Sequence, residues 1–139
     1  MRAELEKAKR LLSDGGYTLA MVRGEETVTS VERGVRPLIN LVDKGESMSG
    51  FCAADKVVGK AAAFMDVLLE VDCLYADVIS GPALEVLKNY GITAEYATQT
   101  EAIRNRTNTG FCPMETAVKE INNPHEALKA IREKLLQMK

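Results

Sequence analysis

The fold is decided by residues 50–97, which read GFCAADKVVGKAAAFMDVLLEVDCLYADVISGPALEVLKNYGITAEYA. Short apolar and β-branched runs in this stretch predict three buried strands, at Gly50–Ala54, Cys73–Ser80 and Ile92–Ala97. An alanine-rich run between the first two strands predicts a helix from Asp55, its expected N-cap, through Glu70. A second helix is predicted at 83–90, because Gly81-Pro82 opens it and Gly91 closes it.

This alternation of strand and helix predicts an α/β fold. Strands joined through a helix pair in parallel, and their right-handed crossovers cover a sheet with helices. Upstream, Tyr17–Val22 and Thr27–Val31 are short β-prone runs that flank a glycine-containing loop and predict an antiparallel hairpin. We therefore expect a three-layer α/β/α sandwich with a mixed sheet, in which the N-terminal hairpin joins the parallel strands.

Helices are expected at both ends of the chain. Residues 2–12 place leucines and alanines on one face, and Pro37 begins a short apolar helix at 38–42. Pro113 and Pro124 each follow a possible cap residue and predict two more helix starts. The last helix is expected to pack on the sheet. No repeat or linker divides the chain, so residues 1–139 are predicted to form a single domain.

The composition is that of a packed protein. Of 139 residues, 46% are hydrophobic and 27% are charged, with a net charge of -2. Basic and acidic residues are interleaved, which argues against a nucleic-acid partner. The charged start MRAELEKAKRLL and the lack of an apolar run of about 20 residues argue against a signal peptide and a membrane span, so we expect a cytoplasmic protein.

A zinc centre is excluded by the ligand count. Such a site needs three or four histidine, cysteine or carboxylate ligands in tight spacing. The single histidine, His125, begins the last predicted helix in a polar context. Cys52, Cys73 and Cys112 fall on three different predicted elements and are expected to be reduced thiols. No metal or other cofactor is expected.

The segment TGFCPMETAV (109–118) is the most chemically suggestive stretch. If Pro113 begins a helix, Cys112 is its N-cap, and unpaired backbone N–H groups favour a thiolate there. Cys112 is therefore a candidate nucleophile, and Glu115 a candidate proton relay. The alternative is that Cys112 only packs while Glu115 caps the helix locally, since a nearby carboxylate disfavours a thiolate.

Lysines near the first alanine-rich helix are candidate ligand contacts. Small residues around Lys60 would let a ligand or another backbone approach it closely. Asp55 and Lys56 are further candidate ligand contacts; Lys56 is expected one turn before Lys60 on the same helix face, where the two like charges repel unless an anion or an acidic side chain lies between them. The alternative for Lys60 is a lysine whose stem packs on the helix while its charge reaches solvent.

Three further polar residues are candidate anion contacts. Arg36 precedes Pro37, and Asn105 and Arg106 lie in a polar approach to Gly110. Such groups hold phosphates or carboxylates at helix N-termini. Polar residues are common in loops, so this signal alone does not define a site.

Three motifs together resemble a small prokaryotic family known only as a domain of unknown function: RGVRPL (33–38), ADKVVGKAA (54–62) and the TGFCPMETAV segment. The resemblance spans nearly the whole chain and implies the fold of the cytidine deaminases, which agrees with the layout expected above. Deaminases carry H-A-E or C-A-E at one helix start and P-C-x-x-C at the next. Here the second motif has Ala83 and Val86 in place of its cysteines, and the first has no ligand or catalytic Glu.

Two functions follow as hypotheses. In the first, a zinc-independent, deaminase-like domain binds a small anionic or nucleotide-like ligand near Lys60 and Cys112. Its enzymatic version makes Cys112 a nucleophile, with Lys60 stabilising negative charge. In the second, the old site is filled by side chains, and the domain is a non-catalytic scaffold that assembles with other chains. A homo-oligomer is expected in either case, and the sequence leaves open whether the protein is an enzyme.

Overall fold

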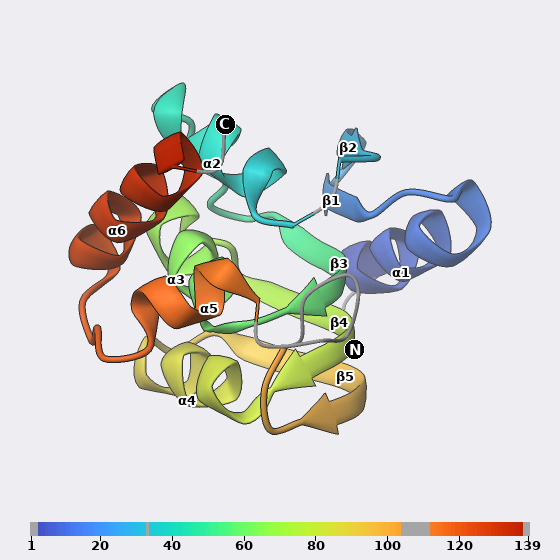
Figure 1. Cartoon of the computed structure of the whole chain (residues 1–139). Helices are drawn as coiled ribbons and strands as arrows, with labels where there is room; N and C mark the ends of the chain where they lie inside the picture. Colours follow the sequence, from blue (N-terminus) through green and yellow to red (C-terminus); the bar gives the residue numbers. More distant parts are fainter. Residues whose placement is uncertain (1–2, 33, 104–111, 138–139) are drawn as a thin grey trace.

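The computed structural model describes residues 3–32, 34–103 and 112–137, which form one mixed five-stranded sheet and six helices (Figure 1). The strands are β1 (Leu19–Arg23), β2 (Glu26–Ser30), β3 (Cys52–Val58), β4 (Cys73–Ser80) and β5 (Thr93–Thr100). The helices are α1 (Ala3–Gly15), α2 (Arg36–Asp43), α3 (Lys60–Leu69), α4 (Gly81–Asn89), α5 (Pro113–Val118) and α6 (Pro124–Gln137). The prediction of a mixed α/β fold is confirmed.

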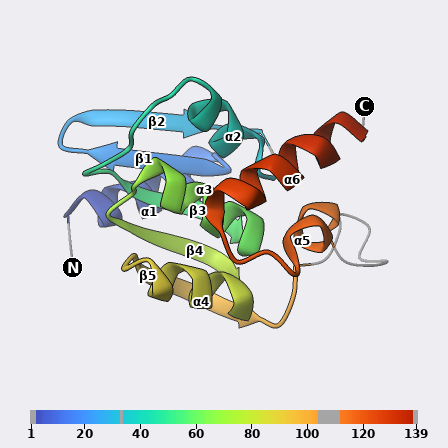
Figure 2. The ribbon, with the colours of Figure 1, turned by 90° about the vertical axis from the view of Figure 1, so that its left-hand side faces the viewer.

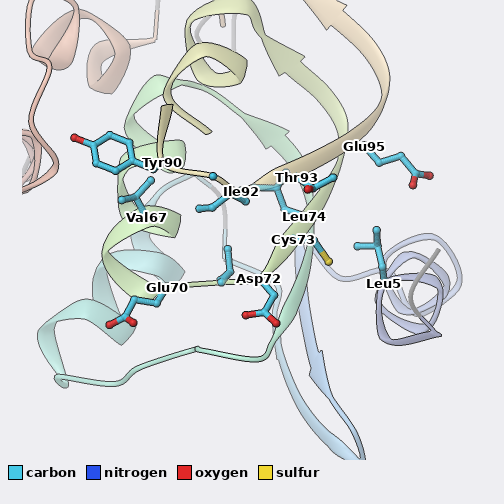
Figure 3. A pocket seen from close by; sticks show the side chains of 12 residues that line it. Leu5, Val67, Glu70, Asp72, Cys73, Leu74, Tyr90, Ile92, Thr93 and Glu95 are labelled. Atoms are coloured by element: carbon cyan, nitrogen blue, oxygen red, sulfur yellow. The ribbon is translucent and has the colours of Figure 1, made fainter. Parts of the chain in front are cut away.

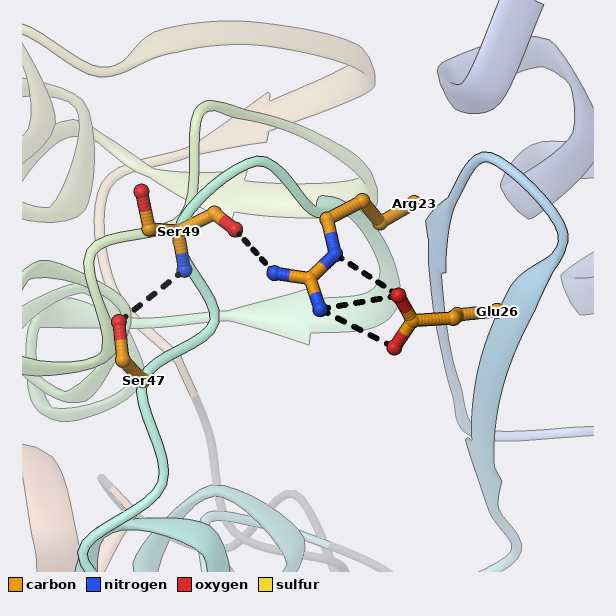
Figure 4. Close-up of polar contacts among 4 residues, drawn as sticks. All are labelled: Arg23, Glu26, Ser47 and Ser49. Carbon is orange, nitrogen blue, oxygen red and sulfur yellow. Dashed lines mark hydrogen bonds and ion pairs between the residues drawn. The ribbon is translucent and has the colours of Figure 1, made fainter.

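The sheet has the order β2-β1-β3-β4-β5. The predicted hairpin is present, because Gly24 adopts the positive φ that a tight turn needs, and β1 pairs antiparallel with both β2 and β3. Arg23 ties this hairpin to the segment before β3: its guanidinium bonds the Glu26 carboxylate and donates from Nη1 to the Ser49 carbonyl at 2.9 Å (Figure 4). The β3, β4 and β5 strands are parallel, as predicted.

Helices cover both faces of the sheet (Figure 2). On one face, α1 packs Ala8 and Leu12 against Val22 of β1 and Ala54 of β3. On the other, residues of α2, α3 and α4 form the main core with the sheet. The α5 and α6 helices lie outside this layer. The expectation that the last helix packs on the sheet is wrong, since α6 contacts α3 and α5 instead.

The boundary between β3 and α3 also differs from the prediction. Asp55 is not a helix N-cap: the strand continues to Val58, Gly59 is the N-cap, and the helix starts at Lys60. Pairing explains the difference, because β4 is long enough to hold Val57 and Val58 in register with Val78 and Ile79. Lys56 is therefore on the strand, and it does not share a helix face with Lys60.

The helices of the described residues include none with the length and hydropathy needed to span a bilayer.

Candidate functional site

The start of α3 is occupied by a carboxylate from a distant part of the chain. The backbone N–H of Lys60 donates to Glu115 Oε1 at 2.6 Å, and the N–H of Ala61 donates to Oε2 at 2.9 Å. Helix N-termini present unpaired N–H groups and the positive end of the helix dipole, so they bind anions. Glu115 lies in α5, 55 residues away from Lys60, and is the anion that this helix start binds.

Gly59 makes this contact possible. A Cβ atom at Gly59 would lie 2.4 Å from both Cδ and Oε1 of Glu115, and 2.7 Å from Oε2. Such distances are far inside van der Waals contact, so the carboxylate can sit here only because residue 59 has no side chain. Gly59 also cannot cap the helix with a side chain of its own, and Glu115 takes that role.

The Lys60 side chain joins the same two helices at a second point. Its Nζ donates to the carbonyl oxygen of Lys119, the C-cap of α5, at 3.0 Å. Its ammonium also lies 5.8 Å from the centroid of the Phe64 ring. Lys60 and Glu115, two candidate residues from the sequence, are therefore brought together, and both bind backbone groups across the α3–α5 contact.

Cys112 is the N-cap residue of α5, as predicted. Its side chain makes no capping hydrogen bond and packs, half-buried, against the main core. Its backbone N–H donates to Ile103 O at 3.0 Å, and its carbonyl accepts from Thr116. The packing role is thus visible in the structure, whereas a nucleophilic role stays a prediction.

The remaining candidates lie apart from Glu115. Lys56 is exposed on β3, and Arg36 is the exposed first residue of α2. No hydrogen bond or ion pair of the described residues joins either one to Lys60 or Glu115. Asn105 and Arg106 lie outside the described residues. The expected cluster of basic anion contacts is therefore not assembled by the described part of the chain.

Two acidic groups, on β3 and α3, have raised pKa values: Asp55 is half-buried and Asp66 is buried. At Asp55, burial raises the carboxyl pKa to about 7, although hydrogen bonds from the backbone N–H groups of Val57 and Lys56 act in the other direction. Asp66 of α3 is 2% exposed, and its Oδ1 has no hydrogen-bond partner among the residues that the structure describes. Burial, and then the charge of Asp55, hold the pKa of Asp66 well above its usual value. In the sequence, Asp66 stands in the apolar run AAAFMDVLL, and this pattern could have predicted a buried acidic residue.

An open pocket of about 940 Å³ lies at the opposite end of the sheet (Figure 3). It lies between the start of β4, the start of β5, the end of α3 and Leu5 of α1. Cys73 lines it and is 7% exposed. Behind it, Cys52 is fully buried, and the two sulfur atoms are 2.7 Å apart. None of the sequence-predicted candidates that the structure describes lines this pocket.

This pair of cysteines was not predicted from the sequence, because the two residues are 21 positions apart and show no C-x-x-C spacing. Their closeness follows from the register of two parallel strands, since Cys52 and Cys73 are directly paired residues at the starts of β3 and β4. The strand-helix-strand unit predicted from the sequence already implied that these two strands are parallel neighbours. Both side chains pack with Leu5 beneath α1.

A five-stranded mixed sheet with helices on both faces, and a helix start capped by an internal carboxylate, define a compact α/β domain of a type that serves many functions. A family model for a domain of unknown function, TM1506 (DUF1893), matches residues 7–135. The chain belongs to this family, and the resemblance expected from the sequence motifs is confirmed.

A solved structure gives the same result. The crystal structure of the DUF1893 family protein TM1506 from Thermotoga maritima superposes with a TM-score of 0.88 at 26% sequence identity. The match covers 96% of this chain and 92% of that chain. No curated protein sequence matches the chain.

Proposed function

We propose that this chain is a non-catalytic, self-associating domain on a zinc-free, deaminase-like scaffold. The observation that carries the non-catalytic part is the Glu115 carboxylate on the N–H groups of Lys60 and Ala61. In the deaminases that the chain resembles, this helix start and the start of α4 carry the zinc-binding motifs. The first is filled here by an internal side chain, and the second has Ala83 and Val86, both buried.

The groups that would hold an anionic ligand are already bound. Both N–H donors at the start of α3 face Glu115, and the Lys60 ammonium donates to the Lys119 carbonyl. An incoming anion would have to displace a carboxylate that is part of the same molecule and therefore always present at high effective concentration. This supports the second hypothesis, in which side chains fill the old site.

The β5 strand supports self-association. It is an edge strand of eight residues in the described sheet, and most of its side chains are exposed. Edge strands are usually protected by lysine, proline or bulges, and β5 carries none of these residues. Its single charge, Glu95, is bound by Lys9 of α1 at 2.7 Å. A long, nearly neutral edge of this kind fits an antiparallel partner strand.

The partner that we propose is a second copy of this chain. In an antiparallel pair about a two-fold axis, a residue meets its own copy only at the axis. Registers centred on Tyr96 or Ala97 place Glu95 opposite neutral side chains, so the copies avoid like-charge contacts. Two sheets would then join into one continuous sheet.

Light scattering coupled to size exclusion tests this proposal. The wild-type chain is expected to elute at twice 15.2 kDa. Ala97→Glu is expected to be monomeric, because it places a new carboxylate opposite itself or opposite Glu95 in these registers. Thr29→Glu, on the β2 edge at the other side of the sheet, is the matched control and should remain dimeric. A monomeric wild type, or a dimeric Ala97→Glu variant, would refute the β5 interface.

Binding of a small anionic or nucleotide-like ligand near Lys60 and Cys112 is the second candidate. It is favoured by position, since the α3–α5 contact lies at the carboxyl ends of parallel strands, where open α/β sheets bind ligands. Thermal-shift assays with phosphate and nucleoside monophosphates distinguish ligand binding from the non-catalytic function proposed above. We expect no shift for wild type and a stabilisation of Glu115→Ala, whose helix start is vacated. A shift for wild type that Lys60→Ala removes would favour the ligand.

A further inference from the structure

The Cys52–Cys73 pair has the placement of a dithiol that can close. The two residues are direct partners in parallel strands, which lie about 4.8 Å apart, within the Cα–Cα range that disulfides span. Their sulfur atoms are 2.7 Å apart, about 0.7 Å beyond the length of a disulfide bond. A bond between them needs a small side-chain movement and no rearrangement of the sheet.

Access to the pair is one-sided. Cys73 lines the open pocket and is 7% exposed, whereas Cys52 is 0% exposed and lies behind it under α1. A small oxidant that enters the pocket therefore reaches Cys73 first. This arrangement is typical of an attacking thiol backed by a resolving thiol.

We propose that Cys52 and Cys73 form a peroxide-oxidisable dithiol whose product is an intramolecular disulfide between β3 and β4. The Cys73 thiol loses its proton to solvent, and the thiolate sulfur attacks one oxygen of hydrogen peroxide, giving Cys73 sulfenic acid and hydroxide. The Cys52 sulfur then attacks the Cys73 sulfur, the S–S bond forms, and the sulfenic oxygen leaves as water. In sum, two thiols are oxidised and one peroxide is reduced to two waters.

The first step is the slow one. Peroxide must first reach the sulfur of a residue that is only 7% exposed at the wall of the pocket. The second step is fast, because the two sulfurs are already in contact, and it protects Cys73 from further oxidation by closing the disulfide before a second peroxide arrives. Cys112 lies on another element and has no part in the reaction.

Peptide mapping by mass spectrometry tests this inference on the full-length wild-type protein. The folded protein is treated with hydrogen peroxide, its remaining thiols are blocked with N-ethylmaleimide, and it is digested without reductant. The expected product is a linked peptide pair that contains Cys52 and Cys73, lost on treatment with dithiothreitol, while Cys112 carries the maleimide. Cys112→Ser is the matched control and should give the same link.

Two variants test the order of the steps. Cys52→Ser should leave a Cys73 sulfenic acid that dimedone traps, and Cys73→Ser should slow the peroxide-dependent loss of the Cys52 thiol by about tenfold or more, because Cys52 is buried. Links to Cys112, over-oxidation of Cys73 without a link, or no reaction of the pair in the folded wild type would each overturn the inference. The peptide mapping of the wild-type protein tests the inference even if a cysteine variant fails to fold.

Discussion

Gly59→Ala and Glu115→Ala are expected to destabilise the protein by similar amounts, because both remove the same contact. The added Cβ would lie 2.4 Å from the Glu115 carboxylate and would force it off the start of α3. The backbone at Gly59 is extended, with φ -98° and ψ -176°, so alanine itself fits the conformation there. The cost of Gly59→Ala should therefore come from Glu115 and not from the backbone.

The magnitude follows from the two hydrogen bonds that are lost. Each joins a backbone N–H to a charged, partly buried carboxylate, which contributes about 1.5 kcal/mol at the lower end of the usual range, or about 3 kcal/mol together. With about 2.1 cal/mol/K of unfolding entropy per residue, 139 residues give about 0.3 kcal/mol/K. Either variant should therefore lower the melting temperature by about 10 °C.

A double-mutant cycle measured by urea unfolding is the decisive assay. The double variant should lose about 3–4 kcal/mol instead of the sum of about 6, since the second substitution finds the contact already broken. Gly81→Ala is the matched control, because a Cβ there would meet Gln99 Nε2 at an ordinary 3.7 Å, and it should change stability by less than about 0.5 kcal/mol. Full additivity of Gly59→Ala and Glu115→Ala would show that Glu115 does not lie against Gly59.

Four further predictions concern Asp55, Asp66, Lys60 and the cysteine pair. The pKa of Asp55 is about 7 in the folded protein and 3.8 in the unfolded chain, so its protonation stabilises the fold fully below pH 3.8, and this stabilisation is lost as the pH rises through 7. In urea unfolding, wild type should therefore lose about 3 kcal/mol of stability relative to Asp55→Asn between pH 4 and 7.5, a value reduced for the partial exposure of Asp55. Parallel pH profiles of the two proteins would contradict this prediction. The Asp66→Asn variant should likewise lose less stability than wild type as the pH rises, because the raised pKa of Asp66 acts in the same direction; urea unfolding against pH measures this. Lys60→Met should lower the melting temperature by about 2–3 °C through loss of the bond to the α5 end, and an unchanged value would show that this bond contributes nothing. Oxidation that links Cys52 to Cys73 should raise the melting temperature by about 10 °C in calorimetry, reversibly with reductant, and a decrease would indicate a strained bond.

Local signals were enough to predict most of the fold. Gly81-Pro82 and Gly91 mark the two ends of α4, and the β4 prediction, Cys73–Ser80, matches the observed strand at both ends. The end of β3 was mispredicted because Asp55 followed by lysine looks like a helix start in isolation. Pairing with β4 keeps residues 55–58 in the sheet, and a single sequence does not display that pairing.

The candidate site was only partly predictable for a related reason. Cys112 followed by Pro113 predicts a helix start from local sequence alone, and this position is confirmed. That Glu115 caps a different helix depends on a contact across 55 residues, which no local pattern encodes. The partnership of Cys52 with Cys73 likewise depends on strand register.

The capping of α3 by Glu115 also sets an order of events during synthesis. The ribosome makes the parallel strands and α3 first, and the carboxylate that completes the helix start follows 55 residues after Lys60. A nascent chain that ends before α5 must leave the amides of Lys60 and Ala61 to water. Completion of this crossover helix therefore waits until α5 has been made.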